Sequence, residues 1–270
     1  MRKLLLGTTA LAAAATLTAN AALADVSISG AAEWTYASRS SNVDANDGTS
    51  MGSDNEMQIN FTNKTDSGLD ITYRVDFDTD AGDGAAFGSD ENSITIAGGF
   101  GKIVLGMDDD AADAYNLDES DLIAEDAAPS VTSATIGTSS SISSDDAMKV
   151  AYHLPAMGGL TAGISHTDRG AAGGTDTTSY GARYSMDAAG ASITLGYAAV
   201  QDENATQDVD QENMGMKIVS GDISLIISQG GYEASDEDRQ HVGASISYKM
   251  PNGMTVGAYT FKTEDDLDAG

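Results

Sequence analysis

The most chemically distinctive part of the sequence is an acidic stretch that follows the strand-like run "KIVLGM" and contains no lysine or arginine from Asp108 to Asp126. Its carboxylates are Asp108, Asp109, Asp110, Asp113, Asp118, Glu119, Asp121, Glu125 and Asp126. A charge run of this kind is typical of a solvated loop that faces the medium. Inside a water-filled channel, the same carboxylates would concentrate cations and repel anions.

Two other kinds of chemistry have weaker support. The carboxylate oxygens suit loosely bound Ca²⁺, but the stretch has neither an EF-hand spacing nor nonapeptide glycine repeats, so no defined metal site or other cofactor is predicted. His153, His166 and His241 are isolated, and no nearby serine or cysteine pattern suggests a nucleophile. The sequence therefore predicts no enzyme.

A formal net charge of -29 argues against nucleic acid as a partner, because phosphate contacts need Lys and Arg.

The first residues read as an export signal. "MRK" is a basic start, "LLLGTTALAAAATLTA" is a short apolar run, and Ala22-Leu23-Ala24 fits the small-x-small cleavage rule. We therefore expect residues 1–24 to be a signal peptide and residues 25–270 to form the mature domain.

The elements that must position the acidic stretch are strands. In "DITYRVDFD", Ile71, Tyr73, Val75 and Phe77 alternate with polar residues, which gives one apolar and one polar face. The same alternation recurs along the chain and predicts thirteen strands with no helix of useful length. The pattern indicates an all-β, antiparallel fold and excludes a disordered acidic chain, which would show no such periodicity.

The connections between these strands alternate between short turns and long polar segments, and the long ones include Ala37–Asn55 and Gly230–Arg239. Tight turns on one rim and long loops on the other are typical of an up-and-down outer-membrane barrel with an apolar outer face and a polar inner face. A soluble β-sandwich would show the same alternation with the apolar face inward. The asymmetry of the connections, the number of strands and the export signal favour the barrel.

The mature start "DVSISGAAEW", the hairpin "GGFGKIVLGMDD", the oversized segment after it and the phrases "PAMGGLTAGISH" and "MPNGMTVGAYTF" resemble the general porins of alphaproteobacteria. The resemblance, to the Gram-negative trimeric porin superfamily, extends over essentially the whole mature chain. It implies a transmembrane barrel of about sixteen strands, a homotrimer, and a third extracellular loop folded into the lumen. The acidic stretch follows the fifth predicted strand and is the third long connection, so the resemblance makes it the constriction loop.

Acidic side chains on one side of a pore suggest basic ones on the other. Strand parity places four basic residues on the inner face: Arg39, Arg74, Lys149 and Arg183. Lys102 and Lys217 are expected nearer the rim of short turns. Each of these residues could equally be an ordinary salt-bridge partner.

Two further expectations concern the whole chain. Thirteen strands leave the C-terminus on the long-loop side, without the aromatic-ended terminal strand that the resemblance implies, so we expect the sequence to be truncated at its C-terminus. The expected function is passive diffusion of small hydrophilic solutes and ions across the outer membrane, with weak cation selectivity and with lipid around the barrel. The alternatives are a substrate-selective channel and a secreted structural or adhesive β-protein; an outer-membrane lipase would need a Ser/His pair that is not apparent.

Overall fold

The structure, a computed structural model, describes residues 25–39, 48–78, 88–122, 147–168, 175–203, 208–234 and 237–266. The predicted signal peptide, Glu125 and Asp126 lie outside the described residues. Arg39 ends a described strand, but its side chain is not described.

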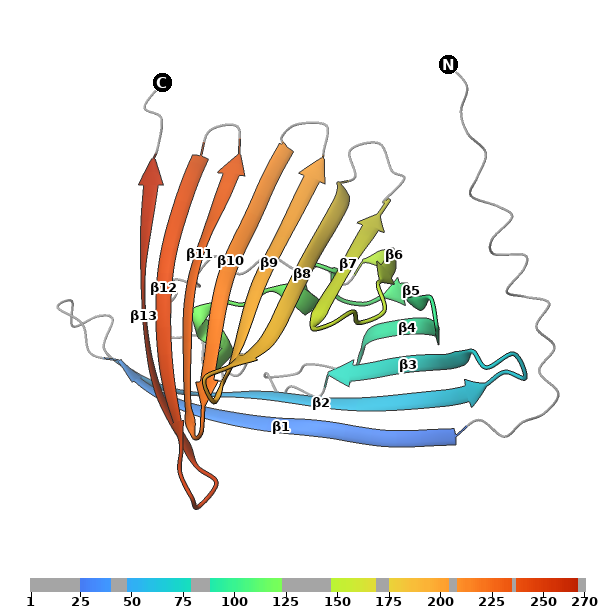
Figure 1. Cartoon of the computed structure of the whole chain (residues 1–270), viewed down its shortest axis with the longest axis horizontal. Helices are drawn as coiled ribbons and strands as arrows, with labels where there is room; N and C mark the ends of the chain where they lie inside the picture. The colour runs from blue at the N-terminus through green and yellow to red at the C-terminus, as the bar shows by residue number, and fades with distance from the viewer. Residues whose placement is uncertain are drawn as a thin grey trace.

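In the described residues, thirteen strands form a single sheet in which each strand pairs antiparallel with the next along the chain (Figure 1). The strands are β1 (Asp25–Arg39), β2 (Gly48–Lys64), β3 (Asp70–Asp78), β4 (Gly88–Gly98), β5 (Gly101–Met107), β6 (Met148–His153), β7 (Leu160–Thr167), β8 (Asp176–Ala188), β9 (Ala191–Glu203), β10 (Asp208–Ser220), β11 (Ile223–Ala234), β12 (Glu237–Lys249) and β13 (Thr255–Asp266). This confirms the all-β meander and the number of strands expected from the alternation. Between the described strands, no backbone pairing joins β1 to β13, so the sheet curves strongly but is open there.

The strands extend further into the long connections than hydrophobic alternation predicted. The segment between residues 37 and 55 was expected to be a loop, but β1 continues to Arg39 and β2 begins at Gly48. Residues 230–239 were also expected to be a loop, yet β11 and β12 pair as far as Ala234 and Glu237. Backbone hydrogen bonding needs no apolar side chains, so a ladder can continue where the strand face becomes polar.

The short turns bring neighbouring strands together at the other rim. In the turn between β8 and β9, Ala189 and Gly190 both have positive φ, at 52° and 82°. Two consecutive residues with positive φ are the requirement of a type I′ hairpin turn, whose twist matches that of the flanking strands.

The two faces of the sheet differ in the way a membrane barrel requires. Large apolar side chains such as Ile28, Ile164, Ile227 and Val256 are exposed on the outward face. On β12, the outward residues from Val242 to Tyr248 cover about 20 Å at about 3.3 Å per residue, which is comparable with the apolar band of outer-membrane barrels. The inner face instead buries small polar side chains such as Ser165 and Ser179. In the described part of the chain, no helix is long and apolar enough to cross a membrane.

Candidate functional site

The acidic segment after β5 folds back against the concave face of the sheet. It contains two short 3₁₀ turns, η2 (Asp113–Tyr115) and η3 (Glu119–Leu122). In Figure 1 this green segment crosses behind the later strands, and η3 contacts β11, β12 and β13. The described part of the acidic stretch therefore lies inside the curve of the sheet rather than beyond its rim.

Backbone groups of the loop are held by polar side chains of the wall. The backbone N–H groups of Ala111 and Ala112 donate to the hydroxyl oxygens of Ser165 and Ser179, at 2.9 and 3.1 Å. The Asn213 amide donates to the carbonyl oxygen of Leu117 at 2.9 Å. A loop has no ladder of its own, so these wall side chains satisfy backbone groups that would otherwise be buried without partners.

A second set of contacts fixes the middle of the loop. The Tyr115 hydroxyl and His153 Nδ1 lie 2.7 Å apart, and Asn213 also donates to the side-chain oxygen of Asn116 at 2.6 Å. Tyr115 and Leu117 are buried against the wall. The result is a small, partly polar packed core, in which the apolar contribution includes Ala112, Ala198 and Val200.

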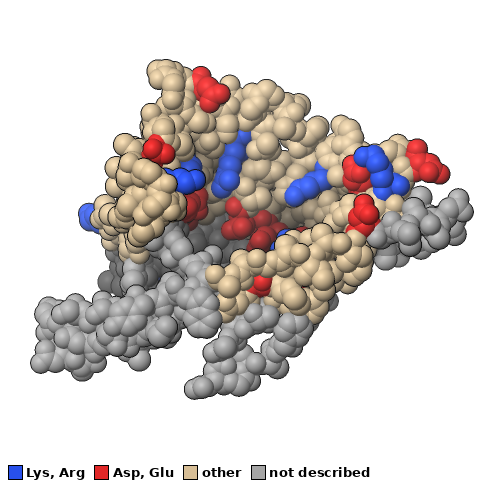
Figure 2. Space-filling model, turned by 90° about the horizontal axis from the view of Figure 1, so that it is seen from below, with Lys and Arg blue, Asp and Glu red and all other residues tan. Residues whose placement is uncertain are grey.

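The loop carboxylates divide into two groups. Asp110, Asp118 and Glu119 are buried, and Asp108 is half-buried. Asp109, Asp113 and Asp121 are exposed. Figure 2, which looks along the hollow of the sheet, shows acidic side chains gathered near its centre with basic side chains on the wall around them.

Three of the predicted basic wall residues contact the loop directly: Arg74, Lys149 and Arg183. Lys149 Nζ lies 3.1 Å from Asp110 Oδ1 and also donates to the carbonyl oxygen of Asp108. The Arg183 guanidinium donates to the carbonyl oxygen of Asn116. These cations therefore lie between wall and loop, where they hold the loop, rather than across the lumen from it.

Arg74 is the centre of a larger ionic group. Its guanidinium pairs with Asp76, with Glu91 at 2.9 Å and with Asp108 at 3.6 Å. Sequence reasoning did not single out Glu91 or Asp76, although both share the inner face with Arg74 and strand parity could have found them. Lys102 is exposed and Lys217 is half-buried.

Glu91, Asp108 and Asp109 are the residues best placed to bind a cation. Each offers a carboxylate oxygen within 4.8 Å of the other two, a spacing that could accommodate a metal ion. The guanidinium of Arg74 already contacts two of the three. A calcium ion at this position would therefore have to compete with a fixed positive charge.

The position of the loop inside the curve of the sheet raises the pKa of two of its exposed carboxylates, Asp113 and Asp121. The pKa of Asp113 is raised to about 6, mainly because the surrounding protein removes water from it and secondly because Asp109 is nearby. The pKa of Asp121 is likewise raised to about 6, by desolvation and then by Asp118. Arg183 opposes both shifts. These two side chains therefore change charge near pH 6.

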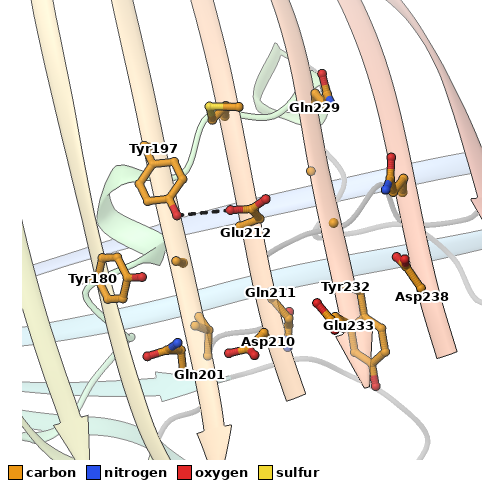
Figure 3. Close-up of a pocket in the computed structure, with 16 residues that line it drawn as sticks. Tyr180, Tyr197, Gln201, Asp210, Gln211, Glu212, Gln229, Tyr232, Glu233 and Asp238 are labelled. Carbon is orange, nitrogen blue, oxygen red and sulfur yellow. Dashed lines mark hydrogen bonds between the residues drawn. The ribbon is translucent and has the colours of Figure 1, made fainter. Parts of the chain in front are cut away.

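The outward face carries a separate polar depression of about 410 Å³ near the long-loop ends of β8 to β12. Figure 3 shows Tyr197 pointing toward Glu212, to which its hydroxyl donates at 3.3 Å, with Tyr180 beside it. The two tyrosine rings are 6.3 Å apart. Aromatic and polar side chains of this kind mark the boundary between the apolar band and water in outer-membrane barrels.

The comparison with protein families decides the identity of the chain. A family model described as Gram-negative porin matches residues 7–270. The chain belongs to the Gram-negative porin family. It is therefore a channel protein of the outer membrane, and the third long connection of this porin is the acidic loop described above.

Solved structures share the fold at low sequence identity. An anion-selective porin from Comamonas acidovorans is 15% identical with a TM-score of 0.63, over 89% of this chain and 80% of that one. The trimer form of OmpT, an outer membrane protein of Vibrio cholerae, is 14% identical with a TM-score of 0.55, over 90% and 89%. A triple mutant of the Rhodopseudomonas blastica porin is 13% identical with a TM-score of 0.57, over 89% and 98%. No curated protein sequence matches the chain.

Proposed function

We propose that this porin is a passive, weakly cation-selective channel for small hydrophilic solutes and ions, without enzymatic activity. The proposal rests on a difference between the basic and the acidic side chains at the loop: two basic side chains of the wall contact the loop, whereas three loop carboxylates are exposed. Lys149 and Arg183 are engaged with the loop from the wall side. Asp109, Asp113 and Asp121 stay exposed.

The mechanism needs no chemical step. Solutes diffuse through water in the lumen, and the loop limits the size of what passes. Exposed carboxylates in a confined, low-dielectric passage raise the local concentration of cations and lower that of anions. Because other basic side chains remain on the inner wall, we expect the preference for cations to be weak rather than absolute.

The anion-selective porin from Comamonas acidovorans has a similar fold. The shared fold is therefore no argument for a preference for cations, and we base the proposed sign of selectivity on the charges of this chain. This chain has 42 acidic and 13 basic residues. An excess of acidic residues attracts cations, whereas an anion-selective lumen would need an excess of basic ones.

The outward face supports a lipid environment over a secreted, water-soluble β-protein. Exposed large apolar residues occur on strands from β1 to β13, among them Val26, Ile94, Leu195 and Val242. An apolar surface of this extent marks a membrane or protein contact. We propose that lipid and neighbouring subunits of a homotrimer cover it, as the trimer form of the Vibrio cholerae protein suggests, after export with removal of residues 1–24.

Substitution of the exposed carboxylates tests the proposal. The double variant Asp113→Asn/Asp121→Asn should form channels of similar conductance whose reversal potential in a KCl gradient shifts toward zero. Asp66→Asn, in the exposed turn between β2 and β3, is the matched control and should behave as the wild type. Selectivity that is identical in wild type and double variant would show that these carboxylates do not set it.

A further inference from the structure

One row of inward-facing residues runs across five neighbouring strands beneath the loop. The backbone register places Arg183, Gly196, Gly215, Ser228 and Gly243 directly opposite one another, in order from β8 to β12. We call these five residues the seat row. The loop segment from residue 115 to residue 119 lies across it.

Each end of the loop segment is held by a polar member of the row. Arg183 donates to the carbonyl oxygen of Asn116, and the Ser228 hydroxyl donates to Oε2 of Glu119. Glu119 is completely buried, although it is a carboxylate on a loop. Burying a carboxylate is costly unless it is hydrogen-bonded, so its position reflects a specific fit to the wall.

The three glycines of the row provide space for the loop. At Gly196, a Cβ atom would lie 3.0 Å from Leu117 Cβ and from Tyr115 O. At Gly215, it would lie 2.6 Å from Leu117 Cβ, and at Gly243 it would overlap the carboxyl group of Glu119. In all three cases, the three nearest atoms belong to the loop and none belongs to the sheet.

Backbone conformation does not explain these glycines. None of the three is among the glycines with positive φ. Glycine inside a strand weakens it and often marks a place where another backbone approaches closely. The loop is that approaching backbone, and it comes closest at Gly215, where the Leu117 carbonyl lies directly over the glycine.

We propose that the seat row is the positioning device that sets how far the loop projects into the lumen, and thereby the bore and the placement of Asp113 and Asp121. This inference rests on the proposed channel function. A methyl group added at Gly215 or Gly243 has no room while the loop is seated, so the loop must move away from the wall. Close-packed interiors respond to a change of a single methylene.

The test compares single-channel conductance of Gly215→Ala and Gly243→Ala with the wild type. Both should conduct less, by about a tenth or more, because the displaced loop narrows the passage. Gly231→Ala is the control: it is also a strand glycine, but it faces outward, and the nearest atom to its added Cβ is 3.7 Å away and belongs to Arg239 rather than to the loop. It should conduct as the wild type does.

A second measurement remains informative if Gly215→Ala or Gly243→Ala impairs folding. In a Glu119→Ala background, the carboxyl group above Gly243 is gone, so adding Gly243→Ala should change conductance little. A merely structural effect of alanine in β12 would persist in that background. Far-UV circular dichroism of the refolded proteins establishes that each variant forms the sheet.

The outcomes separate this inference from the proposed function. A wild type that forms no channel would overturn the channel function itself. A conducting wild type whose Gly215→Ala and Gly243→Ala variants give unchanged conductance would leave the channel function standing and overturn the seat row. An equal change in Gly231→Ala would overturn the seat row as well.

Discussion

Lys149 Nζ lies 3.1 Å from Asp110 Oδ1, and the two side chains are almost completely excluded from water, at 0% and 1% exposure. Lys149 belongs to β6 and Asp110 to the loop that follows β5, so the pair joins the loop to the wall near its start. A buried pair of this kind is expensive to break, because removing one partner leaves an uncompensated charge. The pair therefore holds the loop inward from the point at which it leaves the sheet.

Loss of this pair should destabilise the porin. Lys149→Met leaves Asp110 buried without its cation, and should lower the free energy of unfolding by about 3 kcal/mol or more. Urea unfolding in lipid vesicles measures the change. Lys149→Met/Asp110→Asn should recover part of the loss because no buried charge remains, whereas a double variant less stable than Lys149→Met would contradict this interpretation.

Cation selectivity should depend on pH. The pKa values of Asp113 and Asp121 are raised to about 6, so below that pH the two side chains are neutral and above it they are negative. Selectivity for potassium over chloride should therefore rise as the pH increases from about 5 to about 7. Reversal potentials at several pH values measure it. The variant Asp113→Asn/Asp121→Asn should show a much flatter profile, and an equally steep one would assign the titration to other groups.

Calcium should have little effect on the wild-type channel. The carboxylates of Glu91, Asp108 and Asp109 are close together, but the Arg74 guanidinium contacts two of them. Chelation with EGTA should leave conductance unchanged, whereas Arg74→Gln should create a channel whose conductance responds to added Ca²⁺. A wild-type channel that changes on chelation would indicate that calcium binds despite Arg74.

If the apolar band lies in the membrane, a charged side chain on the outer face should lower the free energy of unfolding more within the band than near its edge. Ile227 lies outward on β11 within the band and is exposed. Ile227→Lys should destabilise the protein by about 2–4 kcal/mol in a lipid bilayer. Gln240→Lys, beside the polar depression near the long-loop end of β12, should cost about 0–1 kcal/mol. Equal costs at the two positions would contradict the placement of the band.

The sequence predicted the strands well because alternation is a local signal. "DITYRVDFD" shows its two faces without any knowledge of its neighbours. Parity also placed Arg74, Lys149 and Arg183 on the inner face. It could not show that these residues contact the loop, because such contacts join positions far apart in the chain: Arg183 and Asn116, for example, are 67 residues apart.

The glycines of the seat row illustrate the same limit. Gly196, Gly215 and Gly243 look like weak points in otherwise regular strands, as the outward-facing Gly231 does. Only the register, which places them side by side, and the path of the loop across them give them a role. The sequence shows only that these three glycines alternate onto the inward face of their strands. Their role can be recognised once the strand pairing is known.

The most direct test of the account is the reversal potential of the wild-type porin, reconstituted in a planar bilayer under a KCl gradient at neutral pH. The account predicts discrete conductance steps and a potential whose sign indicates a modest preference for potassium over chloride. A potential that indicates a preference for chloride would contradict the central claim that the exposed carboxylates of the loop govern the passage.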